Sequence, residues 1–136
     1  MKILFVCTAN CFRSPVAEAL LKKLRSDLTV DSAGTHPASK IAPNARTLLE
    51  RENASENLKE TPEGVEQKKV EEYDLIVAMK NEHRDHLLKY YPQVSEKILV
   101  WNIDDPYFLP AGSDRRILKE IREKVKELSA GLQNRS

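Results

Sequence analysis

Short apolar runs alternate with stretches of helical periodicity along this chain of 136 residues. Apolar runs of about four to eight residues are typical of buried strands, whereas apolar residues spaced by three or four positions indicate helices. The expected strands cover residues 3–6, 28–32, 75–79 and 98–101. Helices are expected over residues 14–25 and 63–72. Three more helices are expected: one starts near Pro43 or Asn44, one is capped by Asn81 and ends near Tyr90, and the last starts at Ser113 or Asp114.

The alternation of strands and helices predicts an α/β fold with a parallel sheet and helices on both faces. Right-handed crossovers favour a three-layer, flavodoxin-like sheet of four strands in the order 2-1-3-4. Because the sequence has no linker, repeat or low-complexity block, we expect a single domain over residues 1–136. In such sheets ligands bind beyond the carboxyl ends of the strands, where the strand order reverses. Here that point lies beside the first strand.

A cysteine and an arginine flank the loop between the first strand and the first helix. Cys7 ends the expected strand, Arg13 follows six positions later, and Pro15 suits the first turn of a helix. A loop that wraps onto a helix N-terminus points backbone N–H groups inward and so attracts an anion. Arg13 can add a planar fork for two phosphate oxygens, and the positive field favours the thiolate form of Cys7. The pattern predicts a loop that binds phosphate and holds a nucleophile beneath the phosphorus.

The stretch VCTANCFRSPVAEAL resembles the phosphate-binding loop of the low-molecular-weight protein tyrosine phosphatases, which reads roughly V-C-x-G-N-x-C-R-S-P. Ala9 replaces the usual glycine, and Cys11 and Phe12 stand where the family has a variable residue followed by its second cysteine. The residues that match in register are Cys7, Asn10, Arg13, Ser14 and Pro15. The residues that the resemblance assigns to phosphate or substrate binding in this loop are Thr8, Ala9, Asn10, Cys11, Phe12, Arg13 and Ser14.

The resemblance also implies a mechanism. It predicts a phosphomonoesterase that needs no metal or cofactor and that hydrolyses phosphotyrosine in proteins through a phosphocysteine on Cys7. Arg13 holds the phosphate oxygens in this mechanism, and Ser14 donates a hydrogen bond to the Cys7 thiolate. Asn10 holds the loop backbone through its side chain. Ser32, at the end of the second expected strand, is a further candidate to hydrogen-bond this loop, with a cap of the strand end as the alternative.

A second motif follows the fourth expected strand, in a loop that emerges at the same edge of the sheet. Asp105 directly precedes Pro106, which favours an extended conformation that can project the carboxyl group over the site. With Tyr107 and Phe108 it resembles the family's D-P-Y-[YF] signature, which makes Asp105 the general acid and leaves Asp104 in reserve. Tyr107 and Phe108 would form an aromatic wall for a phosphotyrosine ring, and we expect at least one of them to be exposed.

The composition of the chain mainly argues against certain classes of function. A net charge of +1 gives no global signal for nucleic acid, and no apolar run reaches the length of a membrane span. We therefore expect a cytoplasmic monomer that acts on a phosphorylated protein and binds neither nucleic acid nor membrane. His83 and His86 lack a third ligand for a metal and are expected on the surface of a helix. Glu18 is expected on the solvent side of the first helix.

Other functions compatible with the same loop need to be weighed. A phosphoarginine phosphatase of the same superfamily is the main alternative. The resemblance implies that the residue four after the nucleophile helps to discriminate, being bulky and aliphatic in typical tyrosine phosphatases and threonine in the arginine type, and Cys11 leaves this choice open. Thr8 is frequent in the arginine type, whereas Tyr107 and Phe108 favour phosphotyrosine. An arsenate reductase needs cysteines outside the loop, and residues 12–136 contain none. A non-enzymatic anion-binding module would need neither Cys7 nor Asp105. Oxidation of Cys7 and Cys11 to a reversible disulfide is a further hypothesis.

Overall fold

The computed structural model describes residues 1–132 and contains one sheet of four parallel strands. The strands are β1 (Lys2–Cys7), β2 (Thr29–Gly34), β3 (Leu75–Ala78) and β4 (Ile98–Val100). The α-helices are α1 (Arg13–Leu24), α2 (Pro43–Arg51), α3 (Asn81–Tyr90) and α4 (Ser113–Leu132). The spatial order is β2-β1-β3-β4, so the predicted fold class and strand order are confirmed.

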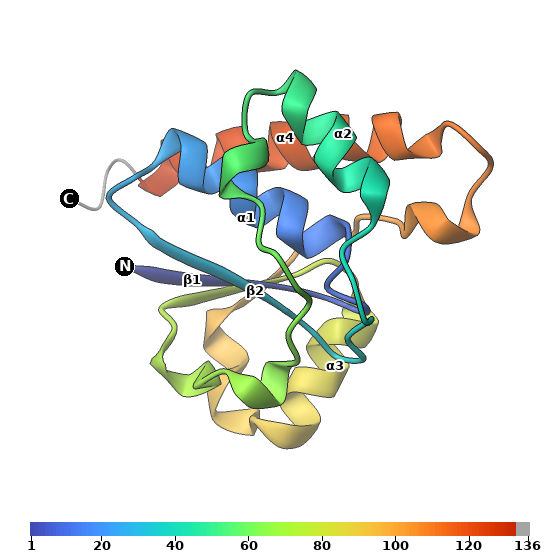
Figure 1. Ribbon diagram of the computed structural model, residues 1–136. Helices are drawn as coiled ribbons and strands as arrows, with labels where there is room; N and C mark the ends of the chain where they lie inside the picture. The colour runs from blue at the N-terminus through green and yellow to red at the C-terminus, as the bar shows by residue number, and fades with distance from the viewer. Residues whose placement is uncertain (133–136) are drawn as a thin grey trace.

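The helices lie on both faces of the sheet, as Figure 1 shows: α1, α2 and α4 cover one face and α3 covers the other. The alternation of side chains along β1 divides the core accordingly. Ile3, Phe5 and Cys7 join the larger core under α1 and α4, whereas Leu4 and Val6 join the smaller core on the α3 face. Because β1 is apolar on both faces, it takes a central place in the sheet. Cys7 consequently ends β1 on the face that α1 covers.

The predicted helix over residues 63–72 is wrong. Two 3₁₀ turns, Val65–Gln67 and Val70–Glu72, take its place. Both valines are buried in the smaller core. A spacing of five residues would put them about 140° apart on an α-helix, so a continuous helix could not direct both toward the sheet. Two separate turns allow both valines to pack.

The ends of the other elements differ from prediction by small amounts. Lys80, and not Asn81, is the N-cap of α3, and the His83 side chain accepts a hydrogen bond from the Lys80 N–H (3.0 Å). Within residues 1–132 no helix is long and apolar enough to cross a bilayer. The Asn-Arg-Ser sequence of residues 134–136 predicts a frayed tail, and these residues lie outside those that the structure describes.

Candidate active site

The loop from Cys7 to Arg13 is held from outside by a neighbouring segment, residues 35–42. The carbonyl groups of four loop residues each accept a backbone hydrogen bond from that segment. Because these carbonyls point outward, the N–H groups of the loop are left to face inward. The four bonds run from Thr35 to Cys7 (3.0 Å), from His36 to Thr8 (2.8 Å), from Ala38 to Ala9 (2.9 Å) and from Ala42 to Cys11 (3.0 Å).

The inward N–H groups and the start of α1 meet the requirements of an anion site. Within residues 1–132, the N–H groups of residues 9–12 donate to no backbone carbonyl. Phe12, the N-cap of α1, supplies no side-chain cap, so the first N–H groups of the helix are also free for a ligand. Several backbone donors at the positive end of a helix dipole are the elements of an anion cradle.

Gly34 allows the end of β2 to approach this loop closely. A Cβ atom at position 34 would lie 2.5 Å from the Thr8 carbonyl oxygen and 3.0 Å from the Asn10 nitrogen. Both neighbours are backbone atoms of the loop, so neither can give way without moving the loop itself. A side chain at this position is therefore incompatible with the loop's geometry.

We expect Gly34→Ala to destabilise the fold by about 1–3 kcal/mol, the usual cost of overpacking, and to weaken the binding of inorganic phosphate. Chemical unfolding and phosphate titration would measure the two effects. Gly131→Ala is the matched control, because nothing lies within 4 Å of a Cβ atom there and alanine favours the α4 helix. A Gly34→Ala protein with the parent's stability and phosphate affinity would contradict the argument.

A chain of buried hydrogen bonds leads to the Cys7 sulfur. The Asn10 amide nitrogen donates to Ser14 Oγ (2.8 Å) and to Ser32 Oγ (2.9 Å), and Ser32 Oγ in turn donates to Glu18 (2.5 Å). Ser14 Oγ also lies 2.9 Å from Cys7 Sγ. Since Ser14 Oγ already accepts from Asn10, its own proton is free to donate to the sulfur. The network therefore orients Ser14 as a donor toward a thiolate at Cys7.

Glu18 belongs to this network, so the prediction of a solvent-facing side chain is wrong. Its side chain is almost fully buried, and the carboxylate takes the Ser32 proton and pairs with Lys22 (2.6 Å). Helical periodicity could not predict the burial of Glu18, because it assigns a polar side chain to solvent, whereas Glu18 packs against a polar partner on β2.

Asn10 fixes the shape of the loop through its backbone and its side chain. Its φ of 52° lies in the left-handed region that asparagine tolerates better than most residues. Its side-chain oxygen accepts from the Glu63 N–H (2.8 Å). Ala9 has no positive φ, so the turn is made by Asn10 and does not require a glycine at position 9. The departure from the family pattern at Ala9 is thereby accommodated.

Cys11 and Phe12 both line the cavity described below but differ in burial. Phe12 is buried in the larger core and anchors the loop, whereas Cys11 is half-buried beside the cavity described below. Burial is the main cause that raises the pKa of the Cys11 thiol. Both cysteines are free, and the hypothesis of a disulfide between Cys7 and Cys11 stays a prediction.

Arg13 is buried and is held from three directions. One guanidinium nitrogen donates to the Ile103 carbonyl (3.0 Å). The other lies 3.5 Å from a carboxylate oxygen of Asp105 and 3.5 Å from Thr8 Oγ1. The loop after β4 thus meets the loop after β1, which the two sequence motifs had led us to expect at one edge of the sheet.

Asp104 and Asp105, adjacent in sequence, turn to different partners. Asp104 pairs with Lys80 (2.5 Å), and the hydrogen bond and charge of Lys80 lower the pKa of the Asp104 carboxyl. Asp105 faces Arg13, and one of its oxygens accepts from the Tyr107 N–H (3.0 Å). Only Asp105 therefore reaches the site around Cys7.

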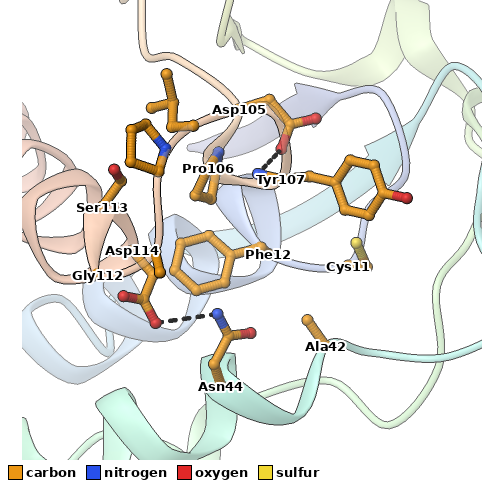
Figure 2. A pocket seen from close by; sticks show the side chains of 13 residues that line it. Cys11, Phe12, Ala42, Asn44, Asp105, Pro106, Tyr107, Gly112, Ser113 and Asp114 are labelled. Atoms are coloured by element: carbon orange, nitrogen blue, oxygen red, sulfur yellow. Dashed lines mark hydrogen bonds between the residues drawn. The ribbon is translucent and has the colours of Figure 1, made fainter.

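A cavity of about 270 Å³ opens beside Asp105 and Cys11. Figure 2 shows the Tyr107 ring at one side of it, above Cys11, and a hydrogen bond between Asn44 and Asp114 at the other. Tyr107 and Phe108 are 85% and 79% exposed, so the expectation that at least one is exposed is confirmed. Their rings meet edge to face, with centroids 5.0 Å apart.

His83 is buried, which contradicts its predicted place on a helix surface. Its Nε2 atom lies 2.8 Å from Thr8 Oγ1. His86 is on the outer side of α3, where its ring meets those of His36 and Tyr90. Among residues 1–132 no cluster of three His, Cys, Asp or Glu side chains could hold a metal ion. The sequence pattern missed His83 because its partner is 75 residues away.

The parallel sheet and the loop with Cys7 and Arg13 at its carboxyl edge define a small α/β protein with a C-x₅-R anion site. The sequence model of the family described as low molecular weight phosphotyrosine protein phosphatase matches residues 2–136. The chain belongs to this family.

Relatives of two kinds are similar in sequence to this chain. The protein-arginine-phosphatase of Bacillus subtilis is 30% identical over 139 residues, which cover 94% of this chain and 91% of that protein. The low molecular weight protein-tyrosine-phosphatase Wzb of Salmonella typhi is 34% identical, over 78% of this chain and 76% of its own. Among solved structures, the YwlE arginine phosphatase from Geobacillus stearothermophilus superposes with a TM-score of 0.86 at 27% identity, covering 98% of this chain and 94% of that one.

Proposed function

We propose that this protein is a cysteine-dependent phosphomonoesterase that hydrolyses phosphotyrosine in proteins. The observation that carries the proposal is the 3.5 Å approach of Asp105 to Arg13. It brings a carboxyl group from the loop after β4 over a loop that already contains a cysteine and an anion cradle. A binding site alone would need neither the cysteine nor the carboxyl group.

In the first step the Cys7 thiolate attacks phosphorus as the bond from phosphorus to the phenolic oxygen breaks. Arg13 and the inward N–H groups hold the three equatorial oxygens, which carry the charge in the transition state. Asp105, in its protonated form, gives its proton to the leaving oxygen. The products are a phosphocysteine and a free tyrosine hydroxyl.

In the second step Asp105 acts in reverse. Its carboxylate takes a proton from water, whose oxygen attacks phosphorus as the bond from sulfur to phosphorus breaks. Inorganic phosphate leaves, and the Ser14 hydroxyl stabilises the returning thiolate at Cys7 with a hydrogen bond. The direction of the hydrogen bonds from Asn10 to Ser14 supports this role.

The exposed aromatic pair favours phosphotyrosine. Tyr107 stands at the mouth of the site beside Asp105, where its ring can pack against a phenolic leaving group. The same surroundings suit a substrate carried on a protein, because the cavity continues from Tyr107 along the surface toward Asp114. We further propose that the protein works as a cytoplasmic monomer over its single domain, residues 1–136.

Phosphoarginine is the second candidate substrate. The observation in its favour is the relative in Bacillus subtilis, a protein-arginine-phosphatase whose similarity covers 94% of this chain. Cys11 is small and half-buried beside the cavity, and Thr8 is the second loop residue in favour of this candidate. Hydrolysis breaks a P–O bond in phosphotyrosine and a P–N bond in phosphoarginine, but both reactions would use Cys7, Arg13 and Asp105.

Hydrolysis of phosphotyrosine and phosphoarginine peptides in the presence of EDTA would test the proposal. We expect phosphate release without added metal and a higher kcat/KM for the phosphotyrosine peptide. Acid quenching during turnover should trap one phosphate per protein, held on sulfur. The reverse preference would move phosphoarginine to first place. A protein that binds phosphate but releases none from either peptide would be an anion-binding module.

A further inference from the structure

His83 has no part in the mechanism above, yet it is 1% exposed and lies directly behind the phosphate-binding loop. It stands in the first turn of α3 and contacts the loop through Thr8. Thr8 in turn lies next to Arg13 (3.5 Å). A buried imidazole in contact with a residue that touches the phosphate-binding arginine calls for an explanation.

The hydrogen bonds around His83 fix its tautomer. The Lys80 N–H can only donate, so Nδ1 of His83 accepts it (3.0 Å) and carries no proton. Burial and the nearby charge of Arg13 lower the pKa of His83 to about 3, so the ring is neutral at pH 7. Its one proton is therefore on Nε2. The nearest carboxylate oxygen, on Glu82, is 3.8 Å from Nε2 and too distant for a hydrogen bond.

Because Nε2 carries the proton, the bond to Thr8 has one direction: His83 donates and Thr8 Oγ1 accepts (2.8 Å). Arg13 has only donors, so Thr8 Oγ1 also accepts from its guanidinium. The threonine oxygen thus receives two donors, and its rotamer is set by the shorter bond, the one to His83.

We propose that His83 is a positioning residue, which holds Thr8 Oγ1 as a fixed acceptor for Arg13 and thereby keeps the guanidinium aligned for phosphate. In the free protein Arg13 has three partners: Ile103, Asp105 and Thr8. A phosphate that takes both outer donors of the fork competes with Asp105, which then turns to the leaving group. Thr8 and the Ile103 carbonyl are the partners that remain, so the contribution of His83 is largest in the complex.

The catalytic part of this inference rests on the proposed function, but the alignment of Arg13 can be tested by phosphate binding alone. Two variants of His83 separate its two hydrogen bonds. His83→Asn keeps an acceptor near the position of Nδ1 for the Lys80 N–H but has nothing that reaches Thr8. His83→Gln extends an NH₂ group to about the position of Nε2, and so restores a donor to Thr8.

We expect His83→Asn to fold and to lose about tenfold in both phosphate affinity and kcat/KM for an aryl phosphate, and His83→Gln to recover most of this loss. Thr8→Val, which keeps the shape and removes the acceptor, should cause a similar loss. The double variant His83→Asn/Thr8→Val should lose no more than either single variant, because both act through one oxygen. A purely structural role for His83 would not produce this non-additivity.

Several outcomes would overturn the inference: parent-level phosphate affinity in His83→Asn, losses that add in the double variant, or no recovery with His83→Gln in a folded protein. If His83→Asn does not fold, Thr8→Val and His83→Gln decide the question by the same titration. If the parent hydrolyses nothing, the proposed function fails, and the phosphate affinities of the variants still test the alignment of Arg13.

Discussion

Cys7→Ser is expected to lower the hydrolysis of aryl phosphates about 10⁴-fold or more while leaving the loop able to bind phosphate. The reason is that a serine hydroxyl is almost entirely protonated at neutral pH, and Asp105 cannot take its proton because Asp105 must itself be protonated in the first step. Ser14 Oγ, 2.9 Å from the sulfur, is oriented as a donor by Asn10 and cannot take the proton. The hydrogen bond from Ser14 therefore stabilises a thiolate at position 7 but does not activate a serine hydroxyl as a nucleophile.

Three measurements check this prediction on the full chain. Initial rates with an aryl phosphate give the loss of activity, phosphate titration gives the affinity, and thermal unfolding shows whether the fold survives. The near-isosteric change should leave the fold intact, because the new hydroxyl group can hydrogen-bond Ser14 at a buried position. Activity in Cys7→Ser above a few per cent of the parent's would rule out nucleophilic attack by Cys7.

The sequence was sufficient to predict the sheet and the two loops of the site, because both depend on local pattern. The apolar run of β1, buried on both faces, marks the central strand, and the alternation with helices determines the strand order. Cys7 and Arg13 are six residues apart, and Asp105 lies in a recognisable motif. Parallel strands bring both segments to one edge without further information.

The partners that stabilise the loop from behind could not be predicted in the same way. Glu18 and His83 are polar residues on helices, and a helical pattern assigns such residues to solvent. Their burial depends on single contacts across the fold, Glu18 with Ser32 and His83 with Thr8. The segment at residues 35–42 holds the loop carbonyls through backbone N–H groups, which leave no trace in the identity of its side chains.

Lys80 decides which of the two aspartates serves the site. Asp104 pairs with Lys80 (2.5 Å), which lowers the pKa of the Asp104 carboxyl and engages it away from the loop of Cys7. Asp105 faces Arg13 (3.5 Å), and one of its oxygens accepts from the Tyr107 N–H (3.0 Å). A cation at the N-cap of α3 thus favours Asp105 over Asp104 as the carboxyl group that serves the site.

Asp105→Asn should consequently reduce turnover by about 10²–10⁴-fold, the usual contribution of a general acid, and the loss should depend on the leaving group. Phosphotyrosine releases a phenol with a pKa of about 10, which needs the proton, whereas a nitrophenyl ester releases a far more stable anion. We therefore expect a much smaller loss with nitrophenyl phosphate than with a phosphotyrosine peptide. Phosphate should bind Asp105→Asn at least as tightly as the parent, because the competing carboxylate at Arg13 is gone.

Asp104→Asn is the matched control, since it makes the same chemical change one residue away and breaks only the exposed pair with Lys80. Its rates should stay within about threefold of the parent's for both substrates. An equal loss in the two variants would mean that the loop, and not the proton of Asp105, is what matters. An equal loss for both leaving groups in Asp105→Asn would argue against proton donation by Asp105. Loss of a general acid should slow the release of a phenol that needs a proton more than the release of nitrophenol, which leaves as a stable anion.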